Sequence, residues 1–494
     1  MSPSIDIRAL RRALDEVLVS WLPRQRWYGG GRSIRAVRCE ELTQIDGHDG
    51  SVSVYICIVF VEHVDAPDAR YNVPVAMSSA GGPRPSDRGA IMYEDDDALI
   101  FDALADARTA APLWRLLASI ETVVLGSGVL VAGGEGLDPA TADISPLVRE
   151  QSNTSLVVGS RHLLKVMRRV VFEPSVELEM TRALAADGFG HVAAVEAWLH
   201  YERDDQAHAA LLALAQPFLH NGTEGWMLAL TSLRDLYADA EEHHPGGAAE
   251  RLQTVEEAGG SFTAEAARLG SITAQMHLML AEAQGEDLAA RPIDSALLGE
   301  WADEMLDDLA ALIGAGGDAM GALRDHQEPL IARISAIRSL RHPGLAIRIH
   351  GDYHLGQVLR TDSGWTVLDF EGEPRRTVEH RRRRHSPLRD VAGMLRSFDY
   401  AASVALIERI QPTDPSWEHL AAHGRTWATA NREAFWSTYV ERTAGSRLIP
   451  DAGAALTLRR AFEIQKAVYE VGYELAHRPN WVSVPLRFLL EATA

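Results

Sequence analysis

Hydrophobic positions near the start of the chain first recur with a helical period and then take the pattern of strands. Between residues 5 and 22 they return every three or four positions, which predicts an amphipathic helix. Two runs rich in β-branched and aromatic residues follow at 51–61 and 71–76 and predict strands. We therefore predict a small α+β unit over residues 1–105.

A second strand-rich region follows and leads into a long helical one. We expect short neighbouring strands, joined by turns, at 122–125, 129–131, 155–158 and 162–166. Residues 174–188 then take a helical pattern. From about residue 220, amphipathic helices continue to the C-terminus, interrupted by short β-like pieces at 345–371. We place the second unit at 106–219 and the helical unit at 220–494.

The composition is that of a globular protein with two or three packed units: 494 residues, 46% of them hydrophobic and 24% charged. The formal net charge of −21 disfavours nucleic acid and anionic membranes as partners, because phosphate groups would be repelled. Two cysteines, Cys39 and Cys57, cannot staple so long a chain, which favours a reducing compartment. The N-terminus lacks a signal-peptide pattern, and no run approaches the ~18 apolar residues of a membrane span. We expect a cytoplasmic protein.

The segment His350-Gly-Asp-Tyr-His-Leu-Gly-Gln357, followed by Leu368-Asp-Phe-Glu371, suits phosphoryl transfer. Transfer from ATP needs a carboxylate near the acceptor hydroxyl and oxygen ligands for Mg²⁺. Asp352 would accept or orient the acceptor proton, and Gln357 and Asp369 would hold the metal. Asp369 ends an apolar strand-like run 17 positions after Asp352, which suits a short hairpin between them.

A bare His-Gly-Asp occurs often by chance, and the same residues could be a turn followed by a strand end. The whole string with its spacing is far more specific and predicts an ATP-dependent small-molecule kinase.

Three segments carry a resemblance: HGDYHLGQVLR, LDFEGEP and the run SPLRDVAGMLRS at 386–397. Together they resemble the aminoglycoside-phosphotransferase-like kinases. Further segments are similar to the actinobacterial maltokinases within that family: 21–28, 150–155, 164–166, 224–226 and 466–474. The resemblance therefore covers almost the whole chain.

The resemblance implies an α+β, bilobal eukaryotic-like kinase fold with an additional N-terminal cap subdomain and a mainly α-helical C-terminal lobe. It implies transfer of the ATP γ-phosphate to the anomeric hydroxyl of maltose, with Mg²⁺. The product, maltose 1-phosphate, would feed α-glucan synthesis from trehalose-derived maltose, in functional association with a trehalose synthase.

Lys165 is the only lysine before Lys466 and lies in a strand-like run, where a kinase needs a cation for ATP phosphates. A solvent-facing lysine is the alternative, but apolar residues flank Lys165 on both sides. We expect a carboxylate partner in the next helix. Glu179 fits the family spacing best, and Glu177 is the second choice.

Two further ATP contacts rest mainly on the resemblance. Ser152, Asn153 and Thr154 lie where protein kinases carry a glycine-rich loop, although this loop contains no glycine. By themselves these residues fit an ordinary polar hairpin. Gln216 and Phe218 follow an apolar strand and mark the expected adenine hinge.

Polar and aromatic side chains recur every three or four positions near the C-terminus and so share one helical face. Such a face suits a sugar, because tyrosine rings pack on its C–H groups; a salt-bridged structural helix is the alternative. Gln465 stands where many relatives carry Asp. The predicted substrate contacts are four residues of this face and two of the motif segments: Lys466, Tyr469, Glu470 and Tyr473, with His354 and Glu371.

Three other features receive structural interpretations. The run Arg381–Arg384 is expected to be a solvated loop rather than a nucleic-acid patch, given the acidic chain. Arg389 and Asp390 are expected to brace the catalytic loop, and His277 to pack near it.

Two other functions stay open. One is a kinase for another acceptor, such as glucosamine, another hexose or an aminoglycoside, since an acidic site would suit an aminated sugar. The other is a pseudokinase scaffold, against which Lys165, Asp352, Gln357 and Asp369 argue, because pseudokinases usually lose one of these groups.

Overall fold

A computed structural model describes residues 7–28, 32–46, 52–79, 82–96, 98–140, 143–147, 153–242, 248–257, 262–315, 319–373 and 376–492. The chain forms two compact units. The first comprises 1–179 and 193–219, and the second comprises 180–192 and 220–494. Each unit is described by itself.

The first unit begins with helix α1 (Ile7–Trp21) packed on a seven-stranded antiparallel sheet. Leu10, Leu14 and Leu18 are buried, as the helical period predicted. The sheet order is β12-β3-β2-β4-β6-β5, with β1 paired to β2. Its strands are β1 (Ile34–Asp46), β2 (Val52–His63), β3 (Ala69–Asn72), β4 (Val75–Ser79), β5 (Ile91–Glu94), β6 (Ala98–Asp102) and β12 (Arg169–Val170).

The predicted strand at 51–61 is confirmed as β2, but the one at 71–76 is two strands. Pro74 lies between β3 and β4 and has no N–H to donate, so the pairing of one strand cannot continue through it. Strand β1 was missed because its alternation is broken: register shifts interrupt its pairing with β2, and Glu41 is buried although it is charged.

A second seven-stranded antiparallel sheet completes this unit, in the order β7-β8-β13-β14-β11-β10-β9. Helix α2 (Ala107–Ala118) packs on it and buries Leu113, Trp114 and Leu117. The predicted strands exist but are not all neighbours, because β13 and β14 separate β8 from β11. The strands are β7 (Thr122–Val124), β8 (Val129–Gly134), β9 (Ile144–Leu147), β10 (Asn153–Val158), β11 (His162–Met167), β13 (Ala197–Glu202) and β14 (Ala210–Pro217). The predicted helix at 174–188 is α3 (Val176–Ala186).

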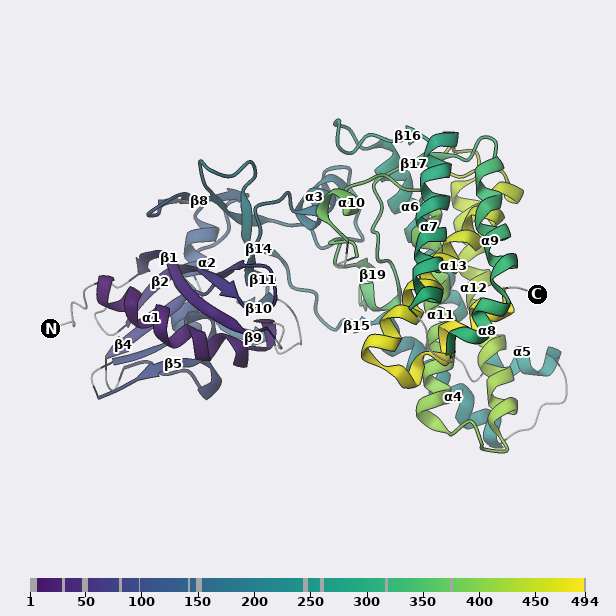
Figure 1. Ribbon diagram of the computed structural model, residues 1–494, viewed down its shortest axis with the longest axis horizontal. Helices are drawn as coiled ribbons and strands as arrows, with labels where there is room; N and C mark the ends of the chain where they lie inside the picture. The colour runs from purple at the N-terminus through teal and green to yellow at the C-terminus, as the bar shows by residue number, and fades with distance from the viewer. Residues whose placement is uncertain are drawn as a thin grey trace. The chain divides into compact units, whose positions relative to one another are not determined.

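The second unit is mainly helical, as predicted. In Figure 1 the long helices α6, α11, α12 and α13 run side by side, and α11 packs against both α12 and α13. The helices are α4 (Gly225–Glu242), α5 (Ala248–Glu257), α6 (Phe262–Glu282), α7 (Ser295–Gly314), α8 (Ala319–Asp325), α9 (Gln327–Ser335), α10 (Val378–Arg381), α11 (Leu388–Arg409), α12 (Trp417–Thr443), α13 (Ala452–His477) and α14 (Ser483–Glu491).

Short strands in the second unit carry the motif. Strands β18 (Val358–Thr361) and β19 (Gly364–Val367) form the hairpin predicted between Asp352 and Asp369, and β15 (Thr223–Glu224) adds to it. Strands β16 (Arg291–Pro292) and β17 (Leu345–Ala346) pair just before the motif. Gly393 of α11 allows close approach to the motif, because a Cβ there would lie 2.6 Å from the Tyr353 carbonyl oxygen.

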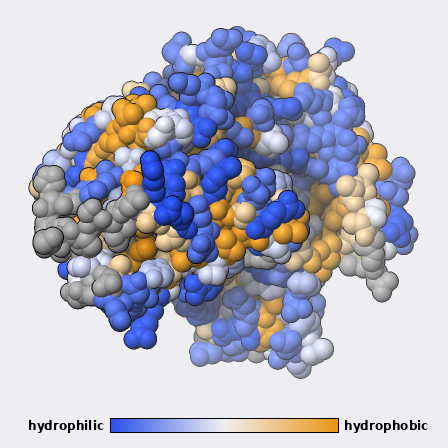
Figure 2. Space-filling view, turned by 60° about the vertical axis from the view of Figure 1, so that its left-hand side comes forward, coloured by the Kyte–Doolittle hydropathy of each residue, from blue (hydrophilic) through white to orange (hydrophobic). Residues whose placement is uncertain are grey.

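Hydrophilic residues cover most of the face drawn in Figure 2, with small hydrophobic areas between them. Within the described ranges, no helix combines the length and the apolar character that crossing a membrane requires.

Candidate active site

Asp390 holds the start of the motif in place from the first turn of α11. Its carboxylate accepts the backbone N–H of His350 at 2.7 Å and of Gly351 at 2.9 Å. His277 of α6, which is fully buried, lies 3.2 Å from the same carboxylate. Burial raises the pKa of Asp390, but the hydrogen bond and charge of His277 outweigh it and lower the pKa overall. The predicted bracing by Asp390 and the predicted packing of His277 near the loop are confirmed, whereas Arg389 contacts His385 instead.

Asp352 is paired with Lys466, a contact that the sequence did not predict. The Nζ of Lys466 donates to Asp352 Oδ1 at 2.8 Å, and His354 Nε2 lies 3.8 Å from Oδ2. Burial alone would raise the pKa of Asp352, but Lys466 and then His354 bring it down to about 2. Asp352 is therefore ionised at neutral pH, and one of its two oxygens is already held.

His354, a predicted substrate contact, shapes the loop around Asp352. It precedes the short 3₁₀ helix Leu355–Gln357, and its Nδ1 accepts the Gly356 N–H at 3.0 Å. Burial, together with Lys466 and His350, lowers its pKa to about 4 against the pull of Asp352. The ring is therefore neutral at pH 7. Because Nδ1 accepts a hydrogen bond, its proton is on Nε2, the nitrogen nearest Asp352.

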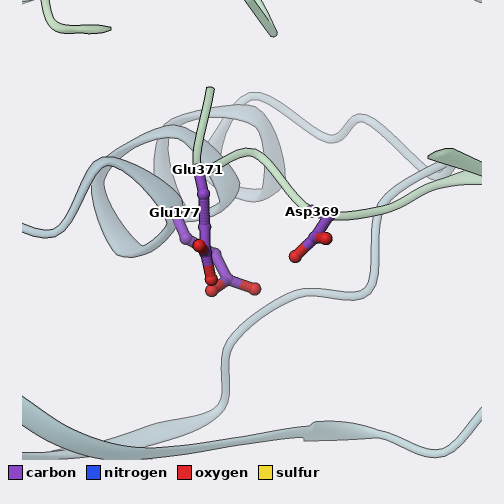
Figure 3. A group of neighbouring side chains, drawn as sticks. All are labelled: Glu177, Asp369 and Glu371. Atoms are coloured by element: carbon purple, nitrogen blue, oxygen red, sulfur yellow. The ribbon is translucent and has the colours of Figure 1, made fainter. Parts of the chain in front are cut away.

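Two carboxylates lie together just after β19. Asp369 has a backbone φ of 62°, which a non-glycine residue rarely adopts and which often marks a functional site. Oxygens of Asp369 and Glu371 lie within 4.8 Å of each other, and Figure 3 labels both on the same loop. Gln357 lies beside this loop, since its backbone carbonyl accepts the Leu368 N–H at 2.9 Å. Glu371, predicted to contact the sugar, thus lies beside the predicted metal ligand Asp369.

A cavity opens beside Asp352 within the helical unit. Glu373 is 9% exposed, and its nearest charged contact among the described residues is Arg376, 3.9 Å from its carboxylate. Lys466 and Arg389 also lie near enough to interact with its charge. Arg376 is itself bound more closely to Asp308, at 2.9 Å. Side chains at the cavity wall include Asp308, Asp352, Glu373, Arg376, Arg389, Gln465, Lys466 and Tyr469.

The predicted sugar face on α13 is only partly directed at this cavity. Lys466 and Tyr469 line it, and the Lys466 ammonium lies 5.0 Å from the Tyr469 ring centre. Glu470 Oε2 instead accepts a hydrogen bond from Arg396 at 2.6 Å. Tyr473 stacks on His477 at 4.4 Å. The alternative of a salt-bridged structural helix therefore holds for Glu470, whereas Lys466 and Tyr469 lie at the cavity.

In the first unit, Lys165 pairs with Glu177, the second choice from the sequence after Glu179. The Nζ of Lys165 donates to Glu177 Oε2 at 2.8 Å, and both side chains are largely buried. Lys165 lies on β11, and Glu177 extends from the first turn of α3, labelled in Figure 3. A helix N-terminus favours a carboxylate at this position. Glu179 lies about half a helical turn further on, so Glu177 and Glu179 project in different directions.

The structure gives less support to the other predicted ATP contacts. Ser152 lies outside the described residues. Asn153 and Thr154 begin strand β10, and the Thr154 hydroxyl accepts from the buried Arg168 at 2.8 Å, which gives Thr154 a structural role. Gln216 pairs with Leu163 in the sheet, and the Phe218 N–H donates to the Arg161 carbonyl at 2.7 Å. This amide is therefore occupied within the protein, which weakens the hinge prediction at Phe218.

The arginine run is anchored rather than a solvated loop. Arg381 donates to the Glu371 carbonyl at 2.8 Å and so fixes the loop that carries Asp369. Arg382 and Arg383 form ion pairs with carboxylates of neighbouring segments. The expectation was wrong because those partners, Asp287 and Glu300, lie more than 80 positions away in sequence.

Several residues at the cavity were missed by the sequence argument, namely Asp308, Glu373 and Arg376. Glu373 could have been predicted, since it stands only two positions after Glu371 in the segment LDFEGEP. Asp308 and Arg376 had no local signal, because their meeting depends on how α7 packs.

Residues 21–106 match the maltokinase N-terminal cap domain, which ends one residue before α2. A glucosamine kinase of Streptacidiphilus jiangxiensis is 29% identical over 85% of this chain and 85% of its own length. The chain thus carries a region similar to the maltokinase N-terminal cap and is similar to a glucosamine kinase along most of its length. The predicted resemblance is thereby confirmed.

Two further proteins are similar to this chain over most of its length. A glucosamine kinase of Mycolicibacterium smegmatis (strain ATCC 700084 / mc(2)155) is 26% identical over 69% of this chain and 77% of its own length. The solved structure of a glucosamine kinase in complex with glucosamine, ADP and inorganic phosphate aligns with a TM-score of 0.65 and 24% identity, over 99% of both chains. The predicted kinase fold with an additional cap is confirmed.

Proposed function

We propose that the chain transfers the γ-phosphoryl group of ATP to a sugar hydroxyl placed beside Asp352. The observation that carries this proposal is the geometry of Asp352: Lys466 holds one oxygen at 2.8 Å, and the pKa is lowered to about 2. A carboxylate with so low a pKa is a weak base. Its role is to orient the hydroxyl and to take the proton late, as the phosphoryl group arrives, which a loose transition state permits.

The chain offers suitable groups for Mg-ATP. Lys165, held by Glu177, would contact the phosphates that are not transferred. Asp369 and Glu371 place carboxylate oxygens within 4.8 Å of each other, and Mg²⁺ prefers such oxygen ligands. Gln357 remains the proposed neutral ligand. When bound, the metal would offset the charge on the phosphates.

Glucosamine is the acceptor that we propose first. The cavity beside Asp352 contains the nearly buried Glu373 carboxylate, whose nearest charged contact among the described residues, with Arg376, is 3.9 Å long. Such a group gains most from a cationic ligand, because an ammonium would supply the missing hydrogen bond. Gln465 also departs from the Asp of many maltokinases. The glucosamine kinases that align with most of this chain support the same choice.

Maltose, the acceptor expected from the sequence, is the second candidate. The cap domain favours it, and so does the aromatic face of α13, where Tyr469 and Tyr473 follow Lys466. From Lys466 to Tyr473 the helix rises about 10 Å, which would extend the site beyond one sugar ring. With maltose as the acceptor, the product would be maltose 1-phosphate. Only in that case would we expect an association with a trehalose synthase.

Acceptor choice is tested by mass spectrometry of products formed from ATP with glucosamine, maltose, glucose or kanamycin. We expect a glucosamine phosphate to form fastest. Glu373→Gln should raise the KM for glucosamine about tenfold or more and leave the KM for uncharged sugars unchanged, since only the ammonium loses an ionic partner. Glu441→Gln, on the exposed end of α12, is the matched control. Preferred phosphorylation of maltose would support the second candidate, and ATP turnover that no acceptor stimulates would contradict both.

A further inference from the structure

A second cavity lies in the helical unit and shares no lining residue with the cavity beside Asp352. Helices α4, α11, α12 and α14 form it, and its volume is about 290 Å³, near the lower end for small-molecule sites. Apolar side chains make part of its wall, including Leu406, Trp417 and Val484. No residue of the predicted phosphoryl-transfer site belongs to it.

Arginines dominate the charged part of this wall, although the chain as a whole is acidic. Four guanidinium groups face two carboxylates in the set Arg396, Arg425, Arg432, Arg487, Asp399 and Glu491. Arg396 is 1% exposed, and its Nε has no hydrogen-bond partner in the described part of the chain. Its guanidinium packs on the Phe488 ring at 4.0 Å. A buried donor without an acceptor costs free energy, which a ligand at the cavity could recover.

The four arginines fall into an inner and an outer pair. Arg432 is held inside by Asp399 at 2.7 Å and by Glu463 at 2.9 Å. The outer arginines are exposed and weakly bound. Arg425 has its nearest carboxylate, that of Glu418, at 4.0 Å, and Arg487 has no carboxylate partner among the residues that the structure describes. The outer pair can therefore bind an anion without breaking an existing ion pair.

Arg396, which with Arg432 forms the inner pair, connects the cavity to Asp352. Arg396 donates to Glu470 at 2.6 Å, and Glu470 lies one helical turn after Lys466 on α13. Lys466 in turn donates to Asp352 at 2.8 Å. Charges thus alternate along Arg396, Glu470, Lys466 and Asp352, so an anion bound in the cavity beside Arg396 would change the electrostatic field on this row while its ion pairs stay intact.

We propose that this cavity is an effector site for a small phosphate monoester, and that its occupation alters acceptor turnover at Asp352. Two outer guanidinium groups match a phosphate dianion in charge and in their capacity for paired hydrogen bonds. The apolar part of the wall would receive the organic part of the ester. Binding does not depend on the proposed kinase activity, whereas the effect on turnover rests on it.

Binding is tested by calorimetry on the full chain, with glucose 6-phosphate as the probe and ADP present at saturation to occupy a nucleotide site. We expect the double variant Arg425→Gln/Arg487→Gln to bind the probe at least about tenfold more weakly, because two charge-assisted contacts are lost. Arg442→Gln, an exposed arginine on the same helix α12, should bind like the native chain. Equal affinity in the double variant, or no binding to the native chain, would overturn the site.

The effect on turnover is measured with the acceptor that the product assay identifies. The probe should change the KM or kcat of the native chain and of Arg442→Gln at least about twofold, a change that the double variant should lose. Without the probe, all three proteins should turn over equally. If the probe binds as expected and no rate changes, the connection to Asp352 is wrong. If no acceptor is turned over, the proposed kinase function fails, and the binding result still decides whether the site exists.

Discussion

Lys165 and Lys466 each donate to a carboxylate oxygen at 2.8 Å, but the two ion pairs are built in different ways. Lys165 lies on β11, and its partner Glu177 follows 12 positions later, at the start of the next helix. Lys466 lies on α13 and reaches back 114 positions to Asp352. The first pair is a local product of strand and helix, whereas the second exists only once the helical unit has packed.

These two residues are the only lysines in the chain, which also contains 46 arginines. An ammonium is a compact charge with three donors, whereas guanidinium is planar and broader. Both lysines stand beside a carboxylate of the predicted phosphoryl-transfer machinery. We propose that the local pair secures a cation for the nucleotide, and that the distant pair sets the charge and orientation of Asp352.

Among changes at Lys165, Lys466 and Glu177, removing the cation of Lys165 should have the largest effect. Lys165→Met keeps the length of the side chain and loses its charge, so we expect kcat/KM for ATP to fall by roughly 100-fold or more. Steady-state kinetics with ATP varied at fixed acceptor would measure the loss. Lys165→Arg is the control for charge alone. Near-native kinetics in Lys165→Met would mean that this lysine is not the phosphate contact.

Removing the distant lysine should change the pH dependence as well as the rate. Burial raises the pKa of Asp352 and Lys466 opposes it, so Lys466→Met should raise this pKa from about 2. The ionised form is lost as pH falls through the pKa, so the acidic limb of the kcat/KM profile should move to higher pH. We expect a loss of roughly tenfold near neutral pH, growing towards about pH 5.

The profile is measured between about pH 5 and pH 8, where Asp352 of the native chain stays ionised throughout. Lys165→Met serves as the comparison, because its loss should not depend on the ionisation of Asp352. Parallel profiles for Lys466→Met and the native chain would rule out the proposed role of Lys466.

The smallest effect, equal at neutral pH to that of Lys466→Met but not growing as the pH falls, separates Glu177 from Glu179. Glu177→Gln removes the charge that holds Lys165, so we expect kcat/KM for ATP to fall about tenfold. Glu179→Gln, two positions away on the same helix, should stay within about twofold of native. The reverse order would show that the ion pair with Glu177 is not the one used in turnover.

Much of the fold follows from patterns that the sequence displays openly. Helix α1 has a buried stripe at helical spacing, and the β18–β19 hairpin fits the distance between Asp352 and Asp369. Strand β1 was not predicted because register shifts break its alternation and the charged Glu41 is buried. The splitting of the 71–76 run could have been predicted, since Pro74 cannot donate within a ladder.

The candidate site was predictable where its residues are close in sequence. Asp352, Gln357 and Asp369 belong to one motif, and Glu177 was already the second choice for Lys165. The pairing of Lys466 with Asp352 left no local trace, because it depends on packing between α13 and the catalytic loop. For the same reason Glu470 was read as a sugar contact, although Arg396, its partner, lies 74 positions away.

The most direct test of the central claim compares the native chain with Asp352→Asn in the formation of sugar phosphate from ATP, followed by phosphorus NMR. The amide keeps the shape of the side chain but cannot accept the hydroxyl proton as a carboxylate does. We predict a loss of turnover of about 1,000-fold or more, with nucleotide affinity and melting temperature close to native. Product formation by Asp352→Asn within about tenfold of the native rate would contradict the account.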